Sequence, residues 1–423
     1  MTAPEPGMTT RAPGIRSRLL GSVRAAGDDH RVTQFELFFD LVFVFAFTQV
    51  TLLMAHAHTG LSVVQGLTVL GMLWWIWCSY SWLANQAQAD KGVLRAGLAI
   101  ATGLMFIVAV AIPDAFSHDE GPNPAAFLLI ACYFAVRAIH AALYIVAAQG
   151  DKSLERQVLR TTLLAAGPSA VLLCLGAWIG GDLQTWIWLF AWVMDAVVLF
   201  LTSRNGAWQL HSAAHWADRY GLVVILAIGE SIVAIGVGLR EIELSVASVF
   251  GALLAIGGAV ILWWLYFHSL AAGAEHALAR RTGMRKVADA TIAYTYLHYL
   301  VIAGVILTAL GIETVMTHIS DPEPLGWFGA AALAGGVALY QAATVFIWFR
   351  MTGRWLVVRL VASTLLLPGV ALAAALPAMA ALGTAVVTGV VLLVIEWRTR
   401  AFAIDAAEAS IADAAGTGSP VKG

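Results

Sequence analysis

Long apolar runs recur along the chain with the length of membrane-spanning helices. A helix needs about 20 predominantly apolar residues to cross ~30 Å of hydrocarbon. Runs of about that length cover residues 33–55, 61–85, 93–112, 125–148, 158–180, 184–202, 220–239, 245–271, 288–311, 325–349, 355–376 and 379–397. The pattern predicts an all-α, polytopic membrane protein with twelve transmembrane helices.

The positions of the basic residues support this count. All but two of the 24 Lys and Arg residues are assigned to alternate loops, with the adjoining ends of the apolar runs, or to the terminal tails, the exceptions being Arg137 and Arg240. The intervening loops, such as 114–123 and 313–323, are acidic instead. Because cytoplasmic loops carry an excess of Lys and Arg, we expect both termini to be cytoplasmic, in a bacterial cytoplasmic (inner) membrane.

Composition excludes an ordinary soluble protein, because 60% of the residues are hydrophobic and only 12% are charged, whereas soluble domains have about 25% charged residues. The three cysteines, Cys78, Cys132 and Cys174, lie within apolar runs and are interpreted as small buried hydrophobic residues. Residues 1–30 and 401–423 have the Pro, Gly and charge content of disordered cytoplasmic tails, and the first contains no apolar signal-peptide region.

An internal repeat with an offset near 200 residues is the next signal. Leu73-Trp74-Trp75 recurs as Leu262-Trp263-Trp264, and Pro168 and Pro368 interrupt the fifth and eleventh runs. The pattern predicts two parallel six-helix repeats, residues 31–204 and 205–400. With an even number of helices in each, they would be related by a pseudo-twofold axis along the membrane normal.

Carboxylates inside the apolar runs are the main functional candidates. Glu36 and Asp40 are one helical turn apart in the first run, and Glu230 lies near the middle of the seventh. The repeat makes Asp40 and Glu230 equivalent, since they precede Trp74 and Trp263 by 34 and 33 residues. Such groups are costly in lipid and mark ion or substrate pathways. We therefore expect Asp40 and Glu230 to bind substrate or protons.

Other polar residues in the apolar runs complete the candidate set. Ser231 could donate to Glu230, and Glu36 either contributes to the site or lies among the lipid headgroups. Arg137, which we expect to be the only intramembrane arginine, has His140 one turn further along. It is the expected counter-ion of Asp40, Glu230 or Asp195. A purely structural ion-pair network is the alternative, because breaking buried pairs is costly whatever their role.

Recognised catalytic and cofactor signatures are not found in the sequence, which has no phosphate-binding Walker loop, dinucleotide fingerprint, nucleophile elbow or His-Glu-x-x-His motif. His211 and His215 have the spacing of metal ligands, but no suitable third ligand is evident, and Trp208 and Trp216 favour an interfacial helix. We expect no enzyme activity, no cofactor and no metal.

Several motifs resemble those of a known family. They are Phe35-Glu36-Leu-Phe-Phe-Asp40, Ala84-Asn85 through Asp90 to Arg95, His215-Trp-Ala-Asp-Arg219, and Gly229-Glu230-Ser231. Over about Arg31 to Arg400 the chain is similar to the bacterial low temperature requirement A proteins. The resemblance implies a polytopic bacterial inner-membrane protein and brings no settled substrate or mechanism.

The leading hypothesis is a secondary transporter, proton-coupled, for an unknown small solute. Its support is the repeat, the intramembrane carboxylates and the lack of a nucleotide-binding signature. The alternatives are an ion channel built on the first and seventh helices and a membrane-embedded enzyme acting on a lipid-linked substrate. The expected partners are membrane lipid and a small solute or ion, including protons, and not nucleic acid.

Overall fold

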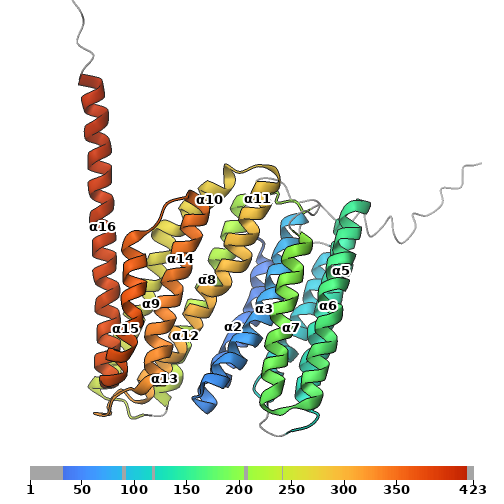
Figure 1. Ribbon diagram of the computed structural model, residues 1–423, viewed down its shortest axis with the longest axis horizontal. Coiled ribbons are helices and arrows are strands. Elements are labelled where there is room, and N and C mark those ends of the chain that lie inside the picture. The colour runs from blue at the N-terminus through green and yellow to red at the C-terminus, as the bar shows by residue number, and fades with distance from the viewer. Residues whose placement is uncertain (1–31, 88–91, 117–119, 204–207, 241, 417–423) are drawn as a thin grey trace, which may run out of the picture. The chain divides into compact units, whose positions relative to one another are not determined.

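The computed structural model describes residues 32–87, 92–116, 120–203, 208–240 and 242–416, and this part of the chain forms helices and loops without a strand. In chain order (Figure 1), the helices are α2 (Gln34–Ala57), α3 (Gly60–Gln86), α4 (Gly92–Ala111), α5 (Pro124–Ala147), α6 (Lys152–Ile179), α7 (Gly181–Ser203), α8 (Ala213–Arg240), α9 (Val246–Leu265), η1 (Tyr266–Ala271), α10 (Ala272–Ala279), α11 (Gly283–Asp289), η2 (Ala290–Leu297), α12 (His298–Thr317), α13 (Gly326–Ala330), η3 (Ala331–Gly335), α14 (Gly336–Thr352), α15 (Val357–Ala375) and α16 (Ala378–Gly416).

Twelve stretches of helix in the described residues are long and apolar enough to cross a membrane, which confirms the predicted count. Three of these stretches, Val246–Ala279, Gly283–Thr317 and Gly326–Thr352, contain a π-helical segment: η1, η2 and η3 respectively. Such wider turns interrupt α-helices mostly in short pieces. α16 continues beyond the predicted end of the twelfth span to Gly416, whereas the tail of residues 1–30 lies outside the described residues.

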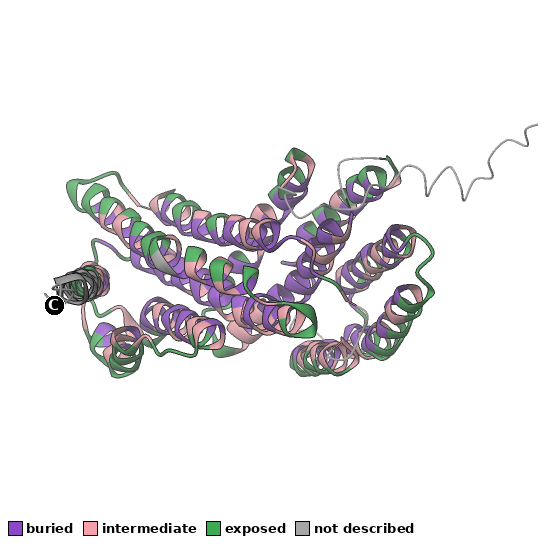
Figure 2. Cartoon of the chain, turned by 90° about the horizontal axis from the view of Figure 1, so that it is seen from above, coloured by how far each residue is buried: buried purple, intermediate pink, exposed green. Residues whose placement is uncertain are grey.

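The distribution of buried residues is that of an integral membrane protein. Buried residues lie on the faces that neighbouring helices turn toward each other (Figure 2), and exposed ones lie on the opposite faces. Those exposed faces carry large apolar side chains, among them Leu163 at 70% exposure and Val171 at 69%. An extended apolar surface of this kind is suited to lipid rather than water.

Polar caps explain why two spans begin earlier than the apolar pattern predicts. α6 begins after Asp151, whose carboxylate accepts from the N–H groups of Ser153 at 2.8 Å and Leu154 at 3.2 Å. The Ser153 hydroxyl and these two N–H groups also lower the pKa of Asp151. α8 begins after Ser212, whose hydroxyl accepts from the His215 N–H at 3.1 Å. The helix therefore begins seven residues before the predicted start of this span at residue 220, and these additional residues form two turns that carry polar side chains.

Contacts divide the chain into two units. The first holds the described parts of residues 1–46 and 72–219, and the second those of 47–71 and 220–423. Helices α2, α3 and α8 are therefore each divided between the two units. In the first unit α4 packs on α5, α5 on α6 and α6 on α7. This division follows contacts and not sequence symmetry, so the repeat boundary at residues 204 and 205 stays a prediction.

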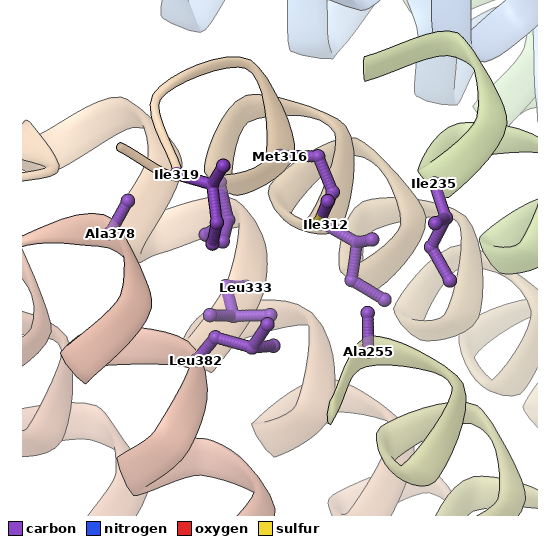
Figure 3. Packing of buried hydrophobic residues seen from close by; sticks show 9 residues of the cluster. Ile235, Ala255, Ile312, Met316, Ile319, Leu333, Ala378 and Leu382 are labelled. Atoms are coloured by element: carbon purple, nitrogen blue, oxygen red, sulfur yellow. The ribbon is translucent and has the colours of Figure 1, made fainter. Parts of the chain in front are cut away.

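An apolar cluster in the second unit fixes the later part of α8 against α9, α12, η3 and α16 (Figure 3). Its buried members are Ile235, Ala255, Ile312, Val315, Met316, Ile319, Leu333, Ala378 and Leu382. Ile235 follows Glu230 on α8 by five residues, and Ile312 precedes Glu313 directly on α12. The cluster thus holds in place two helix segments that carry carboxylates.

Close backbone approach in the second unit depends on three glycines. A Cβ atom at Gly304 of α12 would lie 2.6 Å from the Tyr340 nitrogen, and one at Gly311 would lie 2.4 Å from the Leu333 nitrogen. On the facing helix, a Cβ at Gly336 would lie 2.6 Å from the Thr308 nitrogen. Small residues let membrane helices pack with their backbones in contact. Larger side chains are therefore excluded from these positions.

We expect Gly311→Ala to lower the free energy of unfolding by about 1–3 kcal/mol, the usual cost of overpacking a core. The reason is that the new methyl group would overlap backbone, which cannot move aside as a flexible side chain does. Gly257→Ala on α9 is the matched control, since no atom lies within 4 Å of a Cβ there. Thermal unfolding in detergent measures both variants. Equal midpoints would contradict the close approach of α12 and η3.

Candidate functional site

The two carboxylates of α2 are both buried, and each has a partner on α8 within the first unit. Asp40 is 1% exposed and accepts two hydrogen bonds from the Arg219 guanidinium, Nη1 to Oδ2 at 2.8 Å and Nη2 to Oδ1 at 3.0 Å. The Trp77 indole of α3 donates to Oδ1 at 2.9 Å. Arg219 also lies over the Trp77 ring, 5.2 Å from its centroid. The pair is bidentate, desolvated and supported by an aromatic ring.

Glu36 contacts His215, and these two residues lie one helical turn before Asp40 on α2 and Arg219 on α8. His215 Nε2 is 2.9 Å from Glu36 Oε2, and the Thr33 hydroxyl donates to Oε1 at 3.0 Å. Arg219 Nε is 3.7 Å from Oε2, so Arg219 lies between the two acids. Because each helix contributes residues four apart, the two spacings match. We call Glu36, Asp40, His215 and Arg219 the charge ladder.

Asn85 determines which nitrogen of His215 carries the proton. Its side-chain oxygen accepts from the His211 backbone N–H at 2.8 Å, which fixes the orientation of the amide. The amide nitrogen then donates to the Ser212 carbonyl at 3.0 Å and faces His215 Nδ1 at 3.4 Å. Since Nδ1 must accept, the proton lies on Nε2 and points at Glu36. The imidazole is therefore a donor to the carboxylate.

Glu230, in the second unit, differs from the other buried carboxylates. It is 1% exposed and accepts from the Thr48 hydroxyl of α2 at 2.7 Å, with Thr51 beside it. Glu313 of α12 is near enough to interact with it electrostatically. The Ser231 hydroxyl is buried and does not hydrogen-bond to Glu230. No Lys, Arg or His of the described chain forms an ion pair with Glu230.

Each of the other buried carboxylates in the described spans lies within 4 Å of an arginine nitrogen. The five with almost no exposed surface are Glu36, Asp40, Asp195, Glu230 and Asp289. Asp195 of α7 pairs with Arg137 of α5, through a very short contact to Oδ2 and a second bond to Oδ1 at 3.2 Å. Asp289 of α11 pairs with Arg281 at 3.1 Å and Arg350 at 2.5 Å. Glu230 is thus the exception within this group.

Comparison with known proteins identifies the family of the chain. The family described as "Bacterial low temperature requirement A protein (LtrA)" matches residues 31–394. The chain belongs to this family. A relative from Rhizobium meliloti (strain 1021), named uncharacterized protein RA0937, is 27% identical over 328 residues, which cover 74% of this chain and 76% of that protein. No solved structure matches the chain.

Within this LtrA-family chain, the structure gives the predicted site residues different surroundings. Glu36 and Asp40 lie in the charge ladder, and Arg137 lies with Asp195 rather than with Asp40. His140, one turn along α5 from Arg137, lies between the rings of Tyr80 and Tyr144, at centroid distances of 5.3 and 5.6 Å. It has an aromatic environment.

The basic half of the ladder was not predicted from the sequence. Arg219 was assigned to a cytoplasmic loop and Arg137 was taken as the only arginine in a span, which is wrong because the described spans also contain buried Arg219 and Arg359. Trp216 is fully buried against Trp82, at 4.6 Å between ring centroids, and is not interfacial. The signal that could have identified the ladder is the His215–Arg219 spacing of four, equal to that of Glu36 and Asp40.

Removing the guanidinium of the ladder should destabilise the protein strongly. We expect Arg219→Ala to cost about 3–5 kcal/mol, because it leaves the buried Asp40 carboxylate uncompensated. Asp40→Asn in the same chain should restore part of the loss. Arg219→Lys should fall between, since an ammonium group cannot form the bidentate contact. Chemical denaturation in detergent gives the unfolding free energies of the wild type, the double variant and each single variant, Asp40→Asn included. Strict additivity of Arg219→Ala and Asp40→Asn would contradict the pairing.

The second ion pair provides a test of partner choice. Arg137→Ala should lower the thermal midpoint, and Asp195→Asn should recover part of it, whereas Asp40→Asn should not. Arg240→Ala is the matched control, because Arg240 is exposed at the end of α8. Rescue by Asp40→Asn and not by Asp195→Asn would show that Arg137 serves a different carboxylate from the one it contacts.

Proposed function

We propose that this protein is a proton-coupled secondary transporter of a small solute in the bacterial cytoplasmic membrane, with both termini cytoplasmic, and that Glu230 is its proton-binding residue. The observation that carries the proposal is the lack of a cationic partner for this one buried carboxylate among the described residues. An ionised acid near the centre of a membrane helix costs about 2.5–3.5 kcal/mol on the insertion scale. A bound proton removes that cost.

The surroundings of Glu230 are suited to a proton that comes and goes. The Thr48 hydroxyl can donate to an ionised carboxylate and can accept from a protonated one, so neither state leaves it unsatisfied. When Glu230 and Glu313 are both ionised they repel each other, and one proton bound to either relieves the repulsion. Proton occupancy of the two residues is therefore coupled. Glu313 joins the site by this argument, although the sequence had assigned it to an outer loop.

The charge ladder has a different part in this proposal. Asp40, which the sequence paired with Glu230 as an equivalent acid, is neutralised by the bidentate Arg219 contact. A permanently paired carboxylate cannot exchange protons readily, because losing its charge would leave Arg219 unpaired in a desolvated place. We therefore assign the ladder the role of fixing the register of α2 on α8, the helix that carries Glu230.

A channel is the weaker alternative. A conducting path needs polar side chains along its length, whereas residues 221–239 of α8 contain no polar side chain other than Glu230 and Ser231. Proton and solute would instead be exchanged at a single site near the middle of the membrane, where transporters of related architecture bind them. Among the described residues, no group of three or more His, Cys, Asp or Glu side chains could hold a metal ion, and the enzyme alternative stays a prediction.

Reconstitution into liposomes with a trapped pH dye tests the proposal. Mixtures of small solutes are added outside, and a solute that moves the internal pH identifies a substrate. We expect Glu230→Gln to fold and to lose proton movement, because the amide keeps the shape and the Thr48 contact but cannot titrate. Glu243→Gln, in an exposed loop, is the matched control. Solute-driven proton movement of wild-type size in Glu230→Gln would refute the assignment.

A further inference from the structure

A long apolar groove lies between α15 and α16 in the second unit. It has a volume of about 620 Å³ and also touches η3. Its walls include Val361, Leu365 and Gly369 of α15 and Thr388, Val391 and Ile395 of α16. Several of these side chains have no partner that covers them: Leu365 is 65% exposed, and Val361 and Val391 are each 51% exposed. The groove is open along one side of the helix pair, which Figure 1 shows side by side.

The lining offers nothing polar to an occupant. The two hydroxyls in it are already used, since Thr384 donates to the Ala381 carbonyl at 2.8 Å and Thr388 to the Thr384 carbonyl at 2.7 Å. The lining residues of α15 run from Val357 to Ala373, which is about 24 Å at 1.5 Å per residue. This is long enough for one extended acyl chain in a hydrocarbon core of ~30 Å. An acyl chain is the chemistry that such a surface fits.

One end of the groove is positively charged. Arg354 precedes the first lining residue, Val357, by three positions, and Arg398 follows the last, Ile395, by three on the same face of α16. Both side chains are exposed, and neither guanidinium makes an ion pair or hydrogen bond within the described chain. The one acid between them in the sequence, Glu396, is neutralised by two contacts from buried Arg359, at 2.5 and 2.9 Å.

Aromatic residues mark the same end. Trp355 is 45% exposed and stacks on Phe349, and Trp397 is 68% exposed. Exposed tryptophans gather where hydrocarbon meets the lipid headgroups, so Arg354 and Arg398 lie at headgroup depth. Basic groups at that depth attract anionic lipid. A second copy of this chain is a poorer occupant, because a twofold interface would place the same two arginines of each copy at the same depth, facing each other.

We propose that this groove binds one anionic phospholipid, with an acyl chain along α15 and α16 and the phosphate at Arg354 and Arg398. The site is independent of the transport proposal, since it shares no residue with Glu230 or the charge ladder. Phosphatidylglycerol in the surrounding membrane would fit the chemistry of both ends. Its binding joins the last two spans, whose exposed apolar faces have no other cover in the described chain.

Native mass spectrometry of the full chain in detergent measures the binding. The purified protein is titrated with phosphatidylglycerol or with phosphatidylcholine, and retained lipid is counted. We expect a clear preference for phosphatidylglycerol, and a loss of about tenfold or more in its affinity in Arg354→Gln/Arg398→Gln, since each basic group contributes separately. Arg160→Gln, an exposed arginine on α6, controls for loss of charge. Equal retention of the two lipids would overturn the proposal.

Filling the groove is the second arm. A Cβ at Gly369 meets no atom within 4 Å, so Gly369→Leu should fold and block the acyl chain. Gly167→Leu is the matched control, because Gly167 also lies beside a proline inside a helix and has the same free space. We expect only Gly369→Leu to lose phosphatidylglycerol. Retention of the lipid by Gly369→Leu, or a change from dimer to monomer in place of lipid loss, would overturn the proposal.

Discussion

The cost of an unpaired charge in a low-dielectric interior is the constraint that organises this protein. The bidentate contact between Arg219 and Asp40 shows its consequences most fully. Both side chains are removed from water, so each requires the other. The Trp77 indole and the Ser81 hydroxyl, 3.4 Å from Arg219 Nη2, add further hydrogen bonds. Satisfying this pair fixes the rotation of α2 and α8 and the register between them. Glu36 and His215 then meet one turn away because the helical spacing is the same on both helices.

The same constraint explains why Glu230 differs from the other buried carboxylates. Four of the five most buried carboxylates have an arginine nitrogen within 4 Å, whereas Glu230 has a threonine hydroxyl and a second acid nearby. A carboxylate without a counter-ion can still be stable in this place when it holds a proton. The contrast between the ladder and Glu230 separates acids that hold helices together from an acid that can change its charge.

The two ion pairs near the ends of the predicted repeats bear on internal symmetry. Asp195 and Glu396 are separated by about the offset of the predicted repeat, and each pairs with an arginine. The arginines are not equivalent, because Arg137 belongs to the fourth span and Arg359 to the eleventh, whereas a six-helix repeat relates the fourth span to the tenth. The two pairs follow the same chemical requirement through different helices. Sequence symmetry and pairing are thus separate properties, and the repeat stays a prediction.

The candidate site could be predicted from the sequence only in part. Its acids could be identified because a carboxylate inside an apolar run of about 20 residues departs from the local composition. Their basic partners were not, since His215 and Arg219 occupy a polar segment that reads as a loop until Ser212 caps it as the first turns of α8. Partner choice also depends on residues up to 179 positions apart, as for Asp40 and Arg219. No periodicity or local composition carries that information.

The sequence by itself determined the class of the protein, the number of spans and the position of Glu230 near the middle of one of them. These properties are local, because about 20 apolar residues must cross the hydrocarbon core whatever they pack against. Only the tertiary structure decided which arginine neutralises which acid, that Glu230 has no such partner in the described chain, and that α15 and α16 leave an apolar groove between them. The physical reason is that pairing and burial depend on which helix faces pack together. In a bundle of many spans, the residues that pack together are far apart in the sequence.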